Sequence, residues 1–332
     1  MKLLVLGGTA WLGRELAAHA VAQGHDVTAL ARGTSGAVPD GVDLVRADRD
    51  APGAYDHVAD REWDAVVDLT RQPSHVRGAL AALAERTASW VFVSSVSVYA
   101  SHEHPGTDES AAVLDPVTED DEDPETYGAR KVACEQAVLR AVPDRALVAR
   151  SGLVAGPGDH TDRTGYWPLR FAHPASPDGA VLVPDSPIGT QVVDVRDLAA
   201  WLVDCARDGR AGVVDAVGPV VPLLRHLETA RQVAGHDGEL VAVSPEWLTW
   251  HGVVPWSGER SLPLWLPLPD HAGMMAHPGT RARDLGLRPR PLARTLEDTL
   301  AWELASGPGR RRRAGLAPTD EVALLAAARD GR

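Results

Sequence analysis

Lysine, cysteine and long apolar runs are all scarce in this sequence. Only Lys2 and Lys131 are lysine among 33 basic residues, so a lysine that falls within a recognisable pattern is informative. The two cysteines, Cys134 and Cys205, are too few for a disulfide framework and lack metal-ligand spacing. We therefore expect two buried free thiols and no metal site.

No apolar run approaches the roughly 20 residues of a membrane span, and Met1–Leu6 meets Gly7-Gly8 too soon to form a signal-peptide core. The 33 Lys+Arg and 46 Asp+Glu give a net charge of −13, which repels phosphate backbones and anionic membrane surfaces. We expect a cytoplasmic protein that acts on a small molecule and binds neither nucleic acid nor membrane. Its 332 residues suffice for about two domains.

Short apolar runs alternate with longer amphipathic stretches through the first part of the chain, which is typical of βαβ units in a parallel sheet. Residues Trp11 to Gln23 have helical spacing and end at Gly24, and Asp197–Arg207 predicts another helix. The predicted strands are Leu3–Leu6, Val27–Leu30, Leu44–Val45, Ala65–Leu69, Val91–Val93, Ala146–Ala149 and Val213–Val217.

A glycine-rich turn joins the first predicted strand to the first predicted helix. Glycine lets the backbone approach a pyrophosphate closely, and the N–H groups at a helix N-terminus favour its negative charge. The alternative is a turn that only packs the helix on the sheet. The predicted cofactor-binding residues of this turn are Gly7, Thr9, Ala10, Trp11, Leu12 and Gly13.

The residue after the second strand distinguishes two dinucleotides. A carboxylate there binds the ribose hydroxyls of NAD(H), whereas an arginine pairs with the 2′-phosphate of NADP(H). The sequence reads Leu30-Ala31-Arg32-Gly33, with no acid, so we predict NADP(H) as the preferred cofactor and NAD(H) as the alternative. Arg32 also fits a plain surface loop. Asp48, after the third strand, either accepts a hydrogen bond from adenine or caps a turn.

Tyr127 and Lys131 stand four residues apart in a predicted helix, so both side chains share one face. A free phenol titrates near pKa 10, and a neighbouring ammonium lowers that pKa enough for acid/base work. A substrate oxygen also needs an orienting hydroxyl, and the strand ending in Ser94 and Ser95 offers one at the sheet edge where ligands bind. These serines also fit a role in closing the strand.

Together these residues resemble the short-chain dehydrogenase/reductase superfamily, in its extended and atypical branch of NAD-dependent epimerase/dehydratase type. The matching segments are Gly7–Gly13, Ser94–Tyr99, Tyr127–Lys131, Arg150–Asp159 and Asp194–Ala199. The resemblance implies a Rossmann-type doubly wound parallel sheet with a smaller C-terminal substrate-binding lobe, and a homodimer.

The resemblance also assigns roles to individual residues. It makes Ser95 the catalytic serine and Tyr127 the acid/base, with Lys131 holding the tyrosine and the nicotinamide ribose. Further residues that it places at the cofactor are Leu69, Thr70, Arg71 and Ser94. One departure concerns Gln191, which stands where nucleotide-sugar members usually have a phosphate-binding arginine, so a nucleotide-sugar substrate is disfavoured.

Composition changes after about Val154, where Pro and Gly become frequent and a tryptophan-rich segment follows. We predict an NAD(P)-binding domain at 1–155 and 188–218, a substrate lobe at 156–187 and 219–304, and a C-terminal tail with a short helix at 305–332. The basic run Arg310–Arg313 is interpreted as part of a solvated tail. Four tryptophans of the lobe belong either to its core or to a pocket: Trp247, Trp250, Trp256 and Trp265.

Three functions follow from these residues. The leading hypothesis is an NADP(H)-dependent oxidoreductase of carbonyl reductase/alcohol dehydrogenase type, acting on a small or medium-sized substrate that is apolar or aromatic. The second is an epimerase or dehydratase that retains its cofactor and acts on a sugar-like substrate. The third is a non-catalytic cofactor sensor or RNA-associated protein, which the net charge of −13 and the Tyr–Lys pair both disfavour.

Overall fold

A seven-stranded, all-parallel sheet dominates the computed structural model, which describes residues 1–332 apart from 119–122, 308 and 332. Its strands are β1 (Lys2–Leu6), β2 (Asp26–Ala31), β3 (Val42–Arg46), β4 (Trp63–Asp68), β5 (Thr87–Ser95), β6 (Ala146–Ser151) and β10 (Gly212–Ala216). They lie in the order β10-β6-β5-β4-β1-β2-β3. Strands β2 and β3 are added on one side of β1, whereas β4 and the later strands are added on its other side. This switch point between β1 and β4 creates a crevice at the carboxyl ends of the strands.

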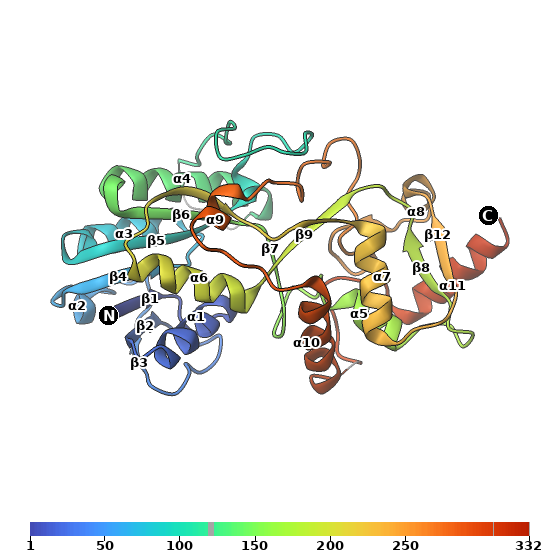
Figure 1. Ribbon diagram of the computed structural model, residues 1–332, viewed down its shortest axis with the longest axis horizontal. Coiled ribbons are helices and arrows are strands. Elements are labelled where there is room, and N and C mark those ends of the chain that lie inside the picture. The colour runs from blue at the N-terminus through green and yellow to red at the C-terminus, as the bar shows by residue number, and fades with distance from the viewer. Residues whose placement is uncertain (119–122, 308, 332) are drawn as a thin grey trace.

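Helices cover both faces of this sheet (Figure 1). They are α1 (Trp11–Ala22) and α6 (Val195–Arg207) on one face, and α2 (Asp56–Ala59), α3 (Pro73–Leu83) and α4 (Tyr127–Ala141) on the other. Leu3 of β1 packs with the first set and Leu4 with the second, because successive side chains of a strand point to opposite faces. The unbroken apolar runs therefore reflect burial on both sides, and the predicted Rossmann-type fold is confirmed.

Both cysteines are free thiols within the two layers of this core, Cys205 on α6 and Cys134 on α4. Burial raises the pKa of the Cys205 thiol to about 12, so it stays protonated and unreactive near neutral pH.

The second half of the chain builds a lobe from short elements, at the opposite end of the molecule from β3 and α2 (Figure 1). Three small sheets, β11-β9-β7, β12-β8 and β13-β14, replace a continuous one. Their strands are β7 (Leu153–Ala155), β8 (Val181–Pro184), β9 (Gly189–Asp194), β11 (Val220–Pro222), β12 (Leu240–Val243), β13 (Val254–Pro255) and β14 (Ser261–Leu262). The helices of the lobe are α5 (Tyr166–Ala172), α7 (Leu223–Ala234), α8 (Pro245–Trp250), α10 (Leu292–Ala305) and α11 (Pro318–Arg329), whereas α9 (Thr280–Asp284) lies against the large sheet.

The helices of the molecule are short, and some of their ends are capped by their own sequence. Asp194 accepts a hydrogen bond from Arg196 N at the start of α6, and Gly235, with φ 64°, ends α7 in the left-handed region. The longest helix, α4, has 15 residues. Over the part of the chain that the structure describes, none of the helices combines the length and apolar character that a membrane crossing needs.

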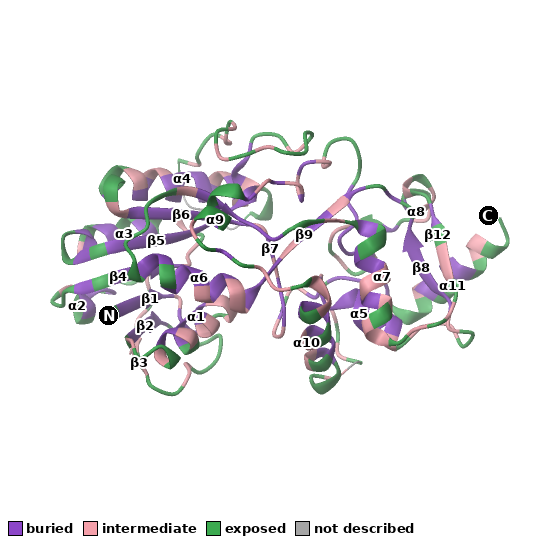
Figure 2. Cartoon of the chain, viewed as in Figure 1, coloured by how far each residue is buried: buried purple, intermediate pink, exposed green. Residues whose placement is uncertain are grey.

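Two segments pack differently from the sequence interpretation. Ala282 of α9, assigned to the substrate lobe, joins the core of the large sheet. The prediction of a solvated C-terminal tail is wrong. Leu316, Leu324 and Leu325 are buried in the second lobe, and Glu303 pairs with arginines of the basic run. Figure 2 shows buried residues along α11 up to its last turns. The exact domain limits stay a prediction.

Candidate functional site

Two adjoining cavities open at the carboxyl ends of the parallel strands and share Ala10, Leu69 and Arg71. One, of about 480 Å³, follows the loops after β1, β2 and β3, and we call it the adenosine cavity. The other, of about 610 Å³, runs between the sheet edge and the second lobe, and we call it the reaction cavity. Every predicted catalytic and cofactor-binding residue lines one or both of them. That these residues bind a cofactor stays a prediction.

The glycine turn supplies an anion-binding helix end between the two cavities. Helix α1 follows Ala10, which gives no side-chain cap, so first-turn N–H groups are left for a ligand. A Cβ on Gly13 would lie 2.4 Å from Gly7 O, so only glycine lets the helix meet the turn this closely. This turn fits a pyrophosphate. Trp11 Nε1 donates to Pro157 O at 2.7 Å and thereby holds the loop after β7 against it.

Three arginines line the adenosine cavity, namely Arg32, Arg49 and Arg71, which it shares with the reaction cavity. Arg49 donates to Asp68 Oδ1 and Oδ2 at 2.8 and 2.9 Å, and this pairing raises the pKa of the Arg49 guanidinium despite the cost of burial. Arg32 is exposed and makes no hydrogen bond or ion pair among the residues described. Thr34 and Ser35, two hydroxyls that the sequence interpretation missed, line the same cavity. The signal for them was their position directly after Arg32-Gly33.

Lys131 is buried beneath the floor of the reaction cavity. Its Nζ donates to Thr70 O at 2.6 Å and Val93 O at 2.7 Å, and lies 4.8 Å from the ring centre of Phe92. Two of its three hydrogens are therefore fixed by the loop after β4 and by β5. Tyr127, one turn earlier on α4, lines the cavity with it.

The first turn of α4 touches the serine segment directly. A Cβ on Gly128 would lie 2.2 Å from Ser97 O, so this glycine permits the close approach that brings Tyr127 beside the serines. Ser95 Oγ donates to Ser97 Oγ at 3.1 Å and accepts from Ser97 N at 3.1 Å. Both hydroxyls line the cavity, and Ser97 is a candidate that the sequence interpretation did not name.

Ser94 uses its hydroxyl elsewhere. It donates to Glu135 Oε1 at 2.5 Å, and Glu135 in turn pairs with Arg150 at 2.8 Å inside the core. Ser94 lines the reaction cavity, but its hydroxyl is engaged in this buried network, which fastens α4 to the sheet.

The outer half of the reaction cavity comes from segments far apart in sequence. Arg163 stands with its guanidinium carbon 4.7 Å from the ring centre of Trp256, and both line the cavity. Of the four tryptophans in question only Trp256 does so: Trp265 is buried, Trp250 is 86% exposed and Trp247 stacks on His251. No local pattern in the sequence predicts that these residues line the outer half of the cavity. Its other lining residues include His160, Thr161, Met274 and Met275.

Gln191, the departure from nucleotide-sugar members, is a buried structural residue. Its Nε2 donates to Gly218 O at 2.8 Å and His277 O at 2.7 Å, and its Oε1 accepts from His277 N at 3.1 Å. All three bonds join β9 to neighbouring loops of the protein. The side chain is therefore occupied and lines neither cavity.

Comparisons with known proteins agree with this geometry. A family profile described as the NAD dependent epimerase/dehydratase family matches residues 3–85. A 2′-dehydrokanamycin reductase of Streptomyces kanamyceticus is 31% identical over 261 residues, which cover 74% of this chain and 70% of that protein.

Solved structures are similar in fold over nearly the whole chain. A UDP-glucuronic acid 4-epimerase from Bacillus cereus in complex with NAD has a TM-score of 0.66 at 14% identity, covering 92% of this chain and 99% of its own. RMD from Pseudomonas aeruginosa complexed with NADPH has a TM-score of 0.60 at 18% identity, covering 91% and 99%. With the glycine turn, the cavities and the 31% identical relative, these likenesses establish that the chain belongs to the NAD dependent epimerase/dehydratase family and is an NAD(P)-dependent enzyme of oxidoreductase type.

Proposed function

We propose that the protein is an NADP(H)-dependent carbonyl reductase, or alcohol dehydrogenase in the reverse direction, for a small or medium-sized substrate with an apolar part. The observation that carries this proposal is that Ser95, Tyr127 and Lys131 line one cavity together with the end of the glycine turn. The reductase activity printed for the 31% identical relative supports the same reaction class.

The side chains divide the work of carbonyl reduction among them. The bound nicotinamide supplies a hydride equivalent to the carbonyl carbon. Ser95 donates a hydrogen bond to the carbonyl oxygen, turning its hydroxyl from Ser97 Oγ to the substrate. Tyr127 gives that oxygen a proton, so that an alcohol forms, and Lys131 compensates the negative charge left on the phenol oxygen. The two carbonyls that hold Lys131 Nζ keep the ammonium in place throughout.

Preference for NADP(H) is proposed from the adenosine cavity. Arg32 is exposed there without a partner among the described residues, next to the hydroxyls of Thr34 and Ser35. A cation and two hydroxyls suit a 2′-phosphate. Of the other two arginines of this cavity, Arg49 is held by Asp68, and Arg71 also lines the reaction cavity.

A retained-cofactor epimerase or dehydratase is the second candidate, because the family includes both kinds of reaction in its name. It predicts nicotinamide bound throughout purification and no net consumption of added cofactor. The engaged side chain of Gln191 counts against the nucleotide-sugar form of this candidate.

The test is NADPH oxidation with a panel of aldehydes and ketones, comparing the parent with Tyr127→Phe. We expect turnover to fall by about 10²- to 10⁴-fold, the usual share of a general acid, with NADPH affinity unchanged. Tyr166→Phe is the matched control, because Tyr166 lines the separate cavity of the second lobe and lies outside the reaction cavity. Equal turnover in the parent and Tyr127→Phe would refute the assigned role.

A further inference from the structure

The loop after β7 is built to present Arg163 to the reaction cavity. Asp159, which precedes it, is fully buried and accepts four hydrogen bonds. Its Oδ1 accepts from Thr161 N at 2.8 Å and Thr161 Oγ1 at 2.6 Å, and its Oδ2 from Thr164 N at 3.2 Å and Thr164 Oγ1 at 2.6 Å. Because both oxygens are satisfied within the loop, Asp159 forms no ion pair with Arg163.

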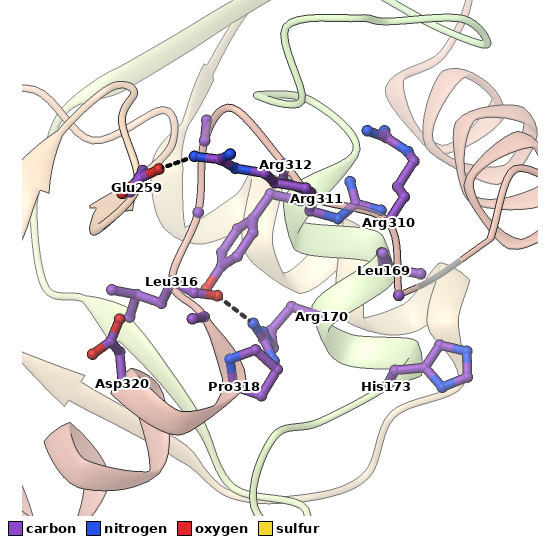
Figure 3. A pocket seen from close by; sticks show the side chains of 15 residues that line it. Leu169, Arg170, His173, Glu259, Arg310, Arg311, Arg312, Leu316, Pro318 and Asp320 are labelled. Carbon is purple, nitrogen blue, oxygen red and sulfur yellow. Dashed lines mark hydrogen bonds and ion pairs between the residues drawn. The ribbon is translucent and has the colours of Figure 1, made fainter.

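The residue before Arg163 is anchored to the other side of the loop. Asp162 has φ 62°, a conformation that costs a non-glycine residue energy and persists only when its surroundings fix it. Its carboxylate accepts from Arg313 N at 2.8 Å and pairs with Arg310. Arg310 and its neighbours line a separate cavity of about 480 Å³ in the second lobe (Figure 3).

The arginines around that second cavity are all neutralised. Arg312 pairs with Glu303 at 2.7 Å, Arg311 pairs with Glu259, and Arg170 lies 2.8 Å from Glu321 (Figure 3 draws the Arg311 pair). These charges hold the C-terminal segment in place and leave no cation for a ligand. The arginines of the second cavity therefore differ from Arg163, which has no ion-pair partner among the described residues.

Arg163 has no such partner. Its single hydrogen bond among the described residues runs from Nε to Thr161 Oγ1 at 3.2 Å, and no described carboxylate lies within ion-pair distance. The guanidinium stacks over Trp256 at 4.7 Å, which shields one face and leaves its edge with free N–H donors. Burial lowers the pKa of Arg163 from its usual value, although the group stays charged near neutral pH. A partly desolvated cation is thus held at the cavity wall.

The cavity as a whole is positive, against the sign of the chain. Its charged lining residues are Arg71, Lys131 and Arg163, and no aspartate or glutamate is among the lining residues described, although the net charge is −13. Trp256, beside Arg163, and Met274 add apolar surface to the cavity. An anionic group attached to an apolar body matches this lining, whereas a polyamine does not.

We propose that Arg163 binds a carboxylate of the substrate, so that the natural substrate is a keto acid or hydroxy acid with an apolar body. This inference rests on the proposed reductase function and specifies its substrate class. A carboxylate carries one charge, which one guanidinium balances, and its planar pair of oxygens matches the free edge of the guanidinium. Arg163 and Tyr127 line the same cavity, so a carboxylate bound by Arg163 lies in the cavity where the carbonyl is reduced.

The experiment is calorimetric titration of the NADP⁺ complex, which cannot reduce a ketone, with phenylpyruvate and with its methyl ester. For the parent we expect the acid to bind about 10- to 100-fold more tightly than the ester, the effect of one charge-assisted pair. Arg163→Gln should bind the two equally, and Arg163→Lys should keep part of the preference. Arg311→Gln removes an 88% exposed arginine outside the cavity and should behave as the parent.

Each outcome has a definite meaning. Equal affinity of acid and ester in the parent, absence of acid binding, or an acid preference that survives in Arg163→Gln overturns the inference. Arg163→Lys serves as the second variant if the glutamine variant does not fold. Acid preference without any NADPH-dependent reduction of phenylpyruvate or of the wider panel would leave the anion site standing and refute the reductase. Reduction of ketones without acid preference would support the reductase and overturn the anion site.

Discussion

Asp215, at the end of β10, should make the stability of the protein fall as pH rises. Its side chain is fully buried and accepts a hydrogen bond from Tyr99 Oη at 2.7 Å, while Oδ2 has no hydrogen-bond partner among the described residues. Burial, with the nearby carboxylate of Glu109 adding to it, raises the pKa of Asp215 to about 7 from 3.8. The folded state therefore holds a proton on this carboxyl that the unfolded chain releases.

The size of the effect follows from this difference in pKa. A carboxyl whose folded-state pKa is raised contributes its full stability below the unfolded pKa and loses it as pH rises through the folded one. A shift of about 3 units corresponds to about 4 kcal/mol at 1.36 kcal/mol per unit, and about 2.5 kcal/mol of that falls between pH 5 and pH 8.

The assay is urea unfolding of the parent and Asp215→Asn at pH 5, 6, 7 and 8. Asparagine keeps an acceptor for Tyr99 and does not titrate, so the groups that do not interact with Asp215 cancel in the comparison. The free energy of unfolding of the variant minus that of the parent should increase by about 2.5 kcal/mol from pH 5 to pH 8. Identical pH slopes in the two proteins would refute the reasoning.

Three further substitutions probe the architecture of the site. Gly13→Ala places a Cβ 2.4 Å from Gly7 O, so it should destabilise the fold by about 1–3 kcal/mol and weaken NADPH binding at least about tenfold, measured by thermal unfolding and fluorescence titration. Lys131→Met should abolish most turnover and cost about 1–3 kcal/mol of unfolding free energy, because two buried carbonyls lose their donor; unchanged stability would contradict the contacts seen. Glu135→Gln leaves the charge of Arg150 unbalanced in the core and should cost about 3–5 kcal/mol in urea unfolding, whereas a loss below about 1 kcal/mol would show the pair to be dispensable.

The sequence predicted well whatever depends on local pattern. Short apolar runs alternating with amphipathic stretches indicated βαβ units in a parallel sheet, and the resemblance carried by the motifs implied the Rossmann-type fold and the family; both the fold and the family are confirmed. The i, i+4 spacing of Tyr127 and Lys131 was sufficient to place both on the cavity side of α4. Cytoplasmic location, the homodimer and the domain limits stay predictions.

What the sequence could not show depends on contacts between distant segments. Arg163 and Trp256 are brought together by the fold of the second lobe, so neither carries a local signal of its place in the reaction cavity. The basic run from Arg310 looked solvated because its partners Asp162 and Glu303 are set by tertiary structure. In the same way, only the structure reveals that the Ser94 hydroxyl serves a buried network.

The most direct measurement is fluorescence titration of freshly purified protein with NADPH and NADH, after recording whether nicotinamide absorbance co-purifies. We expect the purified protein to carry no cofactor and to bind NADPH at least about tenfold more tightly than NADH, and we expect Arg32→Ala to remove this preference. Protein that arrives loaded with NAD(H), or that binds the two cofactors equally, would contradict a dissociable NADPH-dependent reductase.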